Sequence, residues 1–252
     1  MKISFVEIAH FRKLLSVRID FSPTTTLLVG ANNSGKTSAM IALRQFLLQR
    51  GCFCVNDFTL CHWKTINEIG QSWASAKPED EPKDEAEKWL SLCPTLDLWL
   101  DVNEGEFHHV SDLLPVLDWQ GGSLGIRLRY EPKSFSDFRE DFLKAIAEVN
   151  ALHEVLPAKA GVKPPKLWPE NMLSFLQRKL QKHFEIKAYL LDPTKVTDAV
   201  SGIASRALHA LAGDLLRHCV DIFIQCLGVL LWIVREVSWV FSWKTIWCVL
   251  ES

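Results

Sequence analysis

The sequence carries no excess of charge of either sign. Its 28 Lys and Arg residues stand against 30 Asp and Glu residues, which gives a formal net charge of −2 at pH 7. A chain-wide basic field, as in proteins that coat nucleic acid, is therefore excluded, and any nucleic-acid contact must be local. With 48% hydrophobic and 23% charged residues and no internal repeat, the disordered, collagen-like and coiled-coil classes are excluded as well.

Long apolar runs and a disulfide framework are also missing. The uncharged stretch 222–234 is shorter than the about 18 residues that a membrane-spanning helix needs. Charged residues interrupt the N-terminus before an apolar run of signal-peptide length forms. The seven cysteines are an odd number without framework spacing. We therefore expect no membrane span, no disulfide and a cytoplasmic location.

The 252 residues are enough for one large domain or two small ones, and their patterns indicate an α/β fold. Alternating apolar residues predict antiparallel strands over 3–5, 17–21, 96–101 and 124–129, the first two as a hairpin. A β-branched and apolar run over 24–29 predicts a buried strand that ends at Gly30. A short strand is expected over 186–191.

Three helices are predicted where apolar residues recur at three- and four-residue steps. They span 36–50, 138–152 and 173–184. Gly51 stands where a left-handed cap for the first helix belongs, and Pro157 follows the second. The intervening residues 52–93 are less regular, with an acidic, solvated loop at 79–85 that leads into a helix.

Residues 30–37 read Gly-Ala-Asn-Asn-Ser-Gly-Lys-Thr, which fits the phosphate-loop pattern G-x-x-x-x-G-K-[ST]. A strand is expected before the loop and a helix after it, so that backbone N–H groups and the positive end of the helix surround a phosphate. The alternative is a glycine-rich turn without a ligand. The predicted nucleotide-binding residues are Gly30, Asn32, Asn33, Ser34, Gly35, Lys36, Thr37 and Ser38.

Each predicted role follows from the residue type. Gly30 and Gly35 permit backbone torsions and a close approach that a Cβ blocks, and Asn33 tolerates a left-handed torsion. Lys36 is expected to reach the β- and γ-phosphates, and Thr37 to offer its hydroxyl to a metal ion. The expected cofactors are therefore ATP and Mg²⁺.

The flanking sequence resembles a known family. His-Phe-Arg at 10–12, a strand ending Ile-Asp-Phe at 19–21, Leu-Leu-Val-Gly at 27–30 and the loop itself are similar to the start of the RecF/SMC-type branch of ABC ATPases. The nearest resemblance is to the ATPase domain of OLD-family nucleases and their Gabija-like relatives. It covers the first 195 residues, most strongly 1–51.

The resemblance implies an α/β phosphate-loop NTPase, ABC/RecF-like, with N-terminal antiparallel strands and a helical insertion. Residues 1–195 are then the N-terminal part of a RecF/OLD-type ATPase domain, and 196–252 are an apolar tail with four tryptophans. It also implies that Arg12 approaches a nucleotide or DNA phosphate. The alternative for Arg12 is an exposed cation in a turn.

Two parts that the resemblance implies are not found. ABC-type ATPases use a Walker B strand ending in Asp-Glu and a Ser-Gly-Gly-type signature that a partner subunit donates. Asp192 is the best formal Walker B candidate, although Pro193 follows it; Asp101 looks like a surface residue, and Ser201-Gly202 is too short for a signature. No counterpart of the OLD-family Toprim nuclease domain is found either. The apolar, Trp-heavy ending in place of the second half of the ATPase suggests, as a hypothesis, a truncated or frame-shifted reading frame.

Three functions remain open. The leading hypothesis is an ATPase module linked to DNA processing, repair or phage defence, closing as a homodimer or with a partner ATPase subunit. The second is a degenerate phosphate loop that binds nucleotide without turnover and acts through protein contacts. The third is attachment of the Trp-rich tail to a membrane surface.

Two weaker signals favour ordinary structural roles. A zinc site from Cys52, Cys54, Cys61 and His62 lacks the common ligand spacing, so core or incidental cysteines are expected. The adjacent His108 and His109 indicate a surface loop rather than a metal site, because neighbouring side chains point to opposite faces.

Overall fold

The computed structural model of the chain describes residues 2–22, 26–49, 52–75, 83–103, 105, 110, 122–155, 167–191 and 207–210. The chain forms two compact units. Unit 1 comprises residues 1–50, 95–129 and 186–252, and unit 2 comprises residues 51–94 and 130–185. Unit 2 interrupts unit 1 in the sequence and contains most of the helices, as the predicted helical insertion requires. Within the described ranges, no helix combines the length and apolar character that crossing a bilayer requires.

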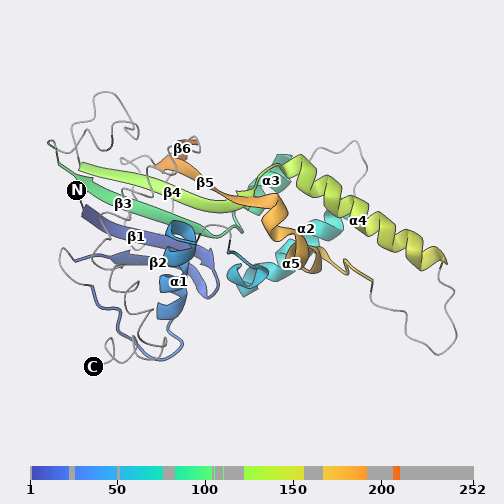
Figure 1. Ribbon diagram of the computed structural model, residues 1–252, viewed down its shortest axis with the longest axis horizontal. Helices are drawn as coiled ribbons and strands as arrows, with labels where there is room; N and C mark the ends of the chain where they lie inside the picture. Colours follow the sequence, from blue (N-terminus) through green and yellow to red (C-terminus); the bar gives the residue numbers. More distant parts are fainter. Residues whose placement is uncertain are drawn as a thin grey trace. The chain divides into compact units, whose positions relative to one another are not determined.

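Unit 1 is built around a sheet with the strand order β2-β1-β3-β4-β5-β6 (Figure 1). The strands are β1 (Lys2–Phe11), β2 (Leu14–Asp20), β3 (Thr95–Val102), β4 (Gly122–Pro132), β5 (Phe184–Leu191) and β6 (Ala207–Ala210). Antiparallel pairing joins β1 to β2, β1 to β3, β3 to β4 and β5 to β6. The predicted hairpin and the three later strands are confirmed, whereas β6 was not predicted.

One face of the sheet is apolar. Its side chains on β1, β3 and β4 are fully buried: Val6, Ile8, Leu96, Leu98, Leu100, Leu124, Ile126 and Leu128. Helix α1 (Lys36–Leu47) lies against β1 and β3 (Figure 1). It buries Ala39, Ala42, Leu43 and Phe46, which recur at three- and four-residue steps. The first predicted helix is thus confirmed, and it ends at Leu47.

The other face carries a row of four charged residues, one on each of four neighbouring strands. Glu7 on β1 lies beside Arg18 on β2 and Asp97 on β3, and Asp97 lies beside Arg127 on β4. Asp97 is fully buried. The Arg127 guanidinium donates two hydrogen bonds to its carboxylate, Nε to Oδ1 at 2.7 Å and Nη2 to Oδ2 at 2.6 Å. This pairing compensates the desolvation of a charge inside the sheet.

A large aromatic side chain next to this row explains a glycine in β4. Trp99 lies opposite Gly125, and a Cβ on Gly125 would stand 2.6 Å from the Trp99 ring. The indole also stacks on Phe5, with 5.6 Å between ring centroids, and forms a buried cluster with Phe5 and Leu191. Strand β3 is therefore buried on both faces, which its alternating sequence did not reveal.

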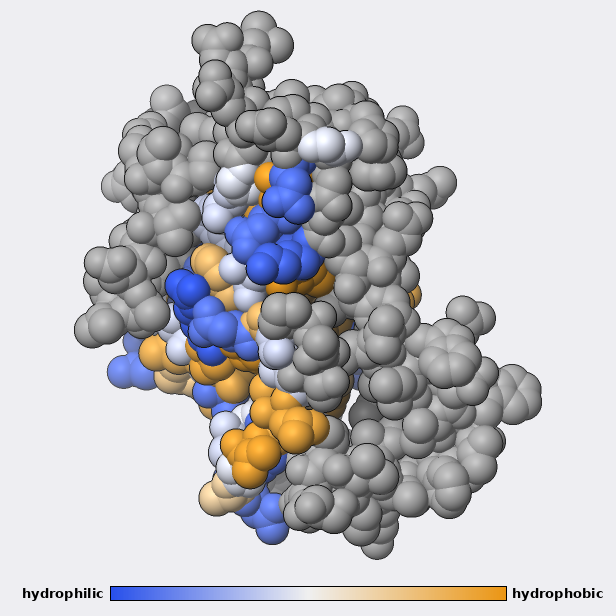
Figure 2. Space-filling model, turned by 90° about the vertical axis from the view of Figure 1, so that its left-hand side faces the viewer, coloured by the Kyte–Doolittle hydropathy of each residue, from blue (hydrophilic) through white to orange (hydrophobic). Residues whose placement is uncertain are grey.

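The buried strand predicted over 24–29 is wrong for the residues described there, 26–29. They form no strand, and Leu27 and Val29 are 62% and 80% exposed. Within the part of the chain that the structure describes, no strand of the sheet pairs with this segment. Its composition suits a strand, but an isolated strand gains no ladder of hydrogen bonds. On the face drawn in Figure 2, apolar residues likewise reach the surface beside hydrophilic ones.

Unit 2 is a helical body with an aromatic core. Its helices are η1 (Val55–Asp57), η2 (Leu60–His62), α2 (Trp63–Ser75), α3 (Lys83–Leu90), α4 (Phe135–Val155) and α5 (Met172–His183). Trp73 on α2 packs against the rings of Trp89, Phe138 and Phe142, with centroids 6.2, 5.3 and 6.1 Å away. The predicted helices corresponding to α4 and α5 are confirmed. A helix is also present where the acidic stretch was expected to lead into one, but α3 begins at Lys83, within the predicted loop 79–85. Helix α2 was not predicted.

The buried ion pair generates a prediction about stability. Arg127→Met should destabilise the fold by about 3–5 kcal/mol, because the Asp97 carboxylate then stays buried without its partner. The double variant Asp97→Leu/Arg127→Met should recover much of that loss. Lys2→Met is the control: it breaks an exposed pair with Asp101 at 3.9 Å and should change the free energy of unfolding by less than about 1 kcal/mol. Urea unfolding curves that show equal losses for Arg127→Met and Lys2→Met would contradict this interpretation.

The neighbouring carboxyl generates a prediction about pH. Burial, and then the Asp97 carboxylate, raise the pKa of Glu7 above its ordinary value of 4.5, although Arg18 and Arg127 oppose the rise. A carboxyl with a raised pKa in the folded chain stabilises the fold while protonated, and this contribution disappears as the pH rises through the folded pKa. Glu7→Gln should therefore be more stable than the parent at neutral pH. The difference in urea midpoint should shrink as the pH falls toward 4.5; a difference that stays constant with pH would refute the prediction.

Candidate functional site

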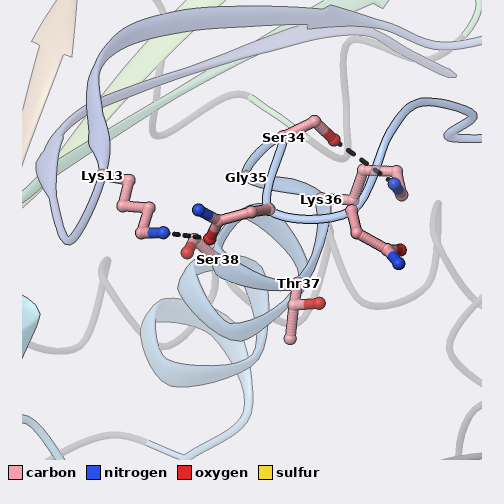
Figure 3. Close-up of a pocket in the computed structure, with 8 residues that line it drawn as sticks. Lys13, Ser34, Gly35, Lys36, Thr37 and Ser38 are labelled. Atoms are coloured by element: carbon pink, nitrogen blue, oxygen red, sulfur yellow. Dashed lines mark hydrogen bonds between the residues drawn. The ribbon is translucent and has the colours of Figure 1, made fainter.

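The predicted phosphate loop leads from the segment 26–29, which is not a strand, to the start of α1 (Figure 3). Two of its residues have left-handed backbone torsions, Asn33 with φ 70° and Gly35 with φ 96°. Gly35 is also the N-cap residue of α1, and no side chain caps this end of the helix. The first N–H groups of an α-helix have no partner inside the helix, so this end offers donors to an anion.

Gly35 also lies close to a side chain of the β1–β2 hairpin. A Cβ built on it would lie 2.8 Å from Leu14 Cδ2. Two carbon atoms that are not bonded do not come this close, so the Leu14 side chain would have to shift. Leu14 is the first residue of β2, directly after the turn of the hairpin. The glycine therefore lets the β1–β2 hairpin pack closely against the phosphate loop.

The Lys36 side chain turns back over the loop. Its Nζ donates hydrogen bonds to the carbonyl oxygen of Gly30, to that of Ala31 at 2.9 Å and to Ser34 Oγ at 3.3 Å. Figure 3 shows the contact with Ser34. Neutral oxygens are weaker partners for an ammonium group than phosphate oxygens, so the lysine is already held near the loop and is available to a stronger acceptor.

A cavity of about 320 Å³ lies at the loop. It is lined by Lys13, Asn32, Asn33, Ser34, Gly35, Lys36, Thr37 and Ser38. The structure thus brings seven of the eight predicted residues together, while the eighth, Gly30, holds the Lys36 ammonium through its carbonyl oxygen. Two cationic side chains and no carboxylate are among these lining residues, which makes the cavity suited to an anion.

Lys13 is the cavity residue that the sequence interpretation missed. It stands in the turn between β1 and β2, next to Arg12. Arg12 is not among the lining residues; its guanidinium lies 5.4 Å from the centroid of the Phe11 ring. The contact of Arg12 with a phosphate stays a prediction. The signal was present in the sequence as two adjacent cations at a turn, but only the structure shows which of them faces the loop.

The carboxylate that a hydrolytic site needs is not among the cavity residues described. Asp101 on β3 accepts a hydrogen bond from Ser123 Oγ at 3.4 Å, and its side chain is 39% exposed, in keeping with a surface position. The other Walker B candidate, Asp192, the dipeptide at 201–202 and the Trp-rich tail beyond 210 lie outside the described residues.

The weak metal motifs do not gather into a site. Cys54 Sγ lies 3.4 Å from Asp57 Oδ2, and Cys61 Sγ lies 3.8 Å from His62 Nδ1. Among the residues that the structure describes, no group of three or more His, Cys, Asp or Glu side chains is arranged to hold a metal ion. His108 and His109 are outside the described ranges.

Comparisons with known proteins find two relatives that act on DNA, according to their names. The chain is 49% identical over 72 residues to the DNA replication and repair protein RecF of Marinobacter nauticus. The aligned segment covers 29% of this chain and 18% of RecF. It is 34% identical over 85 residues to the endonuclease GajA of Bacillus cereus, and this aligned segment covers 33% of the chain and 12% of GajA. The chain therefore spans less than a fifth of the length of either relative.

One similar solved structure comes from work on ATP-driven dimerization and DNA-stimulated activation of SMC ATPases. The alignment covers 72% of the present chain and 98% of the solved chain, and 17% of the aligned residues are identical. Its TM-score is 0.29.

A family profile described as the AAA ATPase domain matches residues 1–206, which include the phosphate loop and every described strand except β6. The match covers well over half of the chain. The chain therefore belongs to the AAA ATPase domain family.

Proposed function

We propose that the chain binds Mg–ATP at its phosphate loop and serves as the ATPase module of a DNA-directed protein of the RecF/OLD type in the cytoplasm. One observation carries the nucleotide part: the uncapped start of α1, the left-handed Gly35 and the Lys36 ammonium converge on a cavity without a carboxylate among its lining residues. The DNA-directed part is supported by the two relatives, one a replication and repair protein and the other an endonuclease.

The residues present fit the polyphosphate of a nucleotide. The backbone N–H groups at the start of α1 and the Lys36 ammonium would hold phosphate oxygens, and the exposed Thr37 would offer its hydroxyl to Mg²⁺. Bound Mg²⁺ neutralises part of the phosphate charge. A volume of about 320 Å³ is at the lower end of the range typical of ligand pockets, which suits the phosphate chain better than a whole nucleotide.

Hydrolysis requires groups beyond these. A carboxylate must position water and metal, and further charge must stabilise the transferring phosphoryl group. We propose that a second copy of the chain or a partner ATPase subunit closes head to tail on the loop and completes the site. The support is that the lining residues supply cations and hydroxyl groups but no carboxylate.

The same observation favours a second candidate, a module that binds nucleotide without turnover and acts through protein contacts. ATP hydrolysis by the purified chain separates the two functions. Hydrolysis that is lost in Lys36→Ala supports the ATPase, whereas tight binding with no hydrolysis at any protein concentration supports the binding module.

Lys36→Ala tests the nucleotide site directly. Loss of charge-assisted hydrogen bonds to phosphate should weaken Mg–ATP binding by at least about tenfold, without changing the melting temperature of the nucleotide-free protein. Isothermal titration measures the affinity. Lys64→Ala, which removes an exposed lysine of α2 paired with Glu68 at 3.6 Å, is the matched control and should bind as the parent does. Equal ATP affinity in Lys36→Ala and the parent would reject the phosphate-loop assignment.

Thr37→Ala tests the metal ligand. Without the hydroxyl, ATP binding should lose most of its dependence on Mg²⁺, because the metal then has no protein oxygen at this position. Titrations with Mg²⁺ and with EDTA should therefore give similar affinities for the variant and different ones for the parent. Thr37→Ser keeps the hydroxyl and should retain the Mg²⁺ dependence. If Thr37→Ala and Thr37→Ser respond alike, Thr37 is not the ligand.

A further inference from the structure

We propose that Lys13 is a second cation of the phosphate site, and that nucleotide binding transfers its ammonium from Asn33 to a phosphate oxygen. The inference rests on the proposed binding of a nucleotide polyphosphate. It adds a binding residue from outside the phosphate-loop motif, contributed by the turn between β1 and β2.

The hairpin is built to bring Lys13 to the loop. Two non-glycine residues that precede it, His10 near the end of β1 and the adjacent Arg12, have left-handed φ values of 55° and 52°. Such torsions cost free energy and persist where surrounding contacts impose them. Leu14, on the other side of Lys13, packs into the space that a Cβ on Gly35 would fill. The turn is thereby held against the phosphate loop by contacts of its neighbours, independently of the charge on Lys13.

The ammonium of Lys13 meets the loop at Asn33. Its Nζ donates a hydrogen bond to Asn33 Oδ1, and Lys13 lines the same cavity as Lys36. Figure 3 shows the two lysines approaching the loop from opposite sides. A phosphate chain seated at the start of α1 would therefore lie between two positive charges.

The proposed exchange of partners follows from charge. Asn33 Oδ1 is a neutral acceptor, whereas a phosphate oxygen carries negative charge and forms a stronger hydrogen bond with an ammonium group. The contact between Lys13 and Asn33 is exposed to solvent, so little desolvation opposes the exchange. Because Lys13 contributes charge rather than shape, Arg should replace it and an uncharged side chain of similar length should not.

The experiment compares Lys13→Met, Lys13→Arg and Lys2→Met in the full chain by titration with Mg–ATP and with inorganic tripolyphosphate. Lys2 is an exposed lysine at the other end of β1, so Lys2→Met makes the same change of charge away from the loop. Lys13→Met should weaken binding of both probes by about five- to tenfold. Lys13→Arg should restore most of the affinity, and Lys2→Met should bind as the parent does.

The melting temperature without ligand distinguishes this role from a structural one. Without ligand, Lys13→Met and Lys2→Met should have the same melting temperature. Mg–ATP should raise the melting temperature of Lys13→Met by less than it raises that of Lys2→Met. If the parent binds Mg–ATP and Lys13→Met binds it equally well, the inference about Lys13 is overturned and the proposed function stands. Weaker binding that is matched by an equal loss of ligand-free stability, and not rescued by Arg, also overturns it. If the parent binds neither probe, both proposals fail.

Discussion

The left-handed backbone at Gly35 is the constraint on which the proposed phosphate site depends. Gly35 ends the loop and is also the N-cap residue of α1. Because it has no side chain, the helix begins without a side-chain cap, and its first N–H groups are open to an anion. The missing side chain also leaves room for Leu14, which places the β1–β2 turn, and with it Lys13, at the same loop. Helix α1 is in turn anchored on β1 and β3 by its apolar stripe. Packing of neighbouring residues therefore places the backbone of both lysines at the loop, and their own hydrogen bonds hold the ammonium groups there.

The two faces of the sheet specify the structure in different ways. The apolar face supplies the area buried against α1, while the charged row Arg18, Glu7, Asp97 and Arg127 fixes how the strands align. A slip by one residue would move each charge to the apolar face and separate Asp97 from its guanidinium. Arg18 adds a further restraint, because its guanidinium lies 3.5 Å from the centroid of the Phe5 ring and also pairs with Asp20 at 2.8 Å. The row thus contributes register, and the apolar face contributes most of the stability.

Local patterns were enough to predict the hairpin, most strands, four of the helices and seven of the cavity residues, because periodicity and the phosphate-loop motif act over short sequence distances. What they missed depends on neighbours far away in the chain. Asp97 is buried because Arg127 stands opposite it, and Trp99 is buried because Gly125 leaves it room. The segment 26–29 has the composition of a buried strand, yet no described strand pairs with it. Lys13 reaches the loop through the fold of a hairpin, which a linear motif does not contain.

We propose that this cavity recognises the phosphates of a nucleotide. The most direct measurement is the affinity of the parent chain for ATP, ADP, AMP and adenosine in the presence of Mg²⁺, determined by titration calorimetry at one ionic strength. Recognition by Lys36 and the start of α1 predicts that ATP and ADP bind at least about tenfold more tightly than AMP, and that adenosine binds weakest. Equal affinity for all four ligands, or no binding of ATP at millimolar concentration, would contradict the claim.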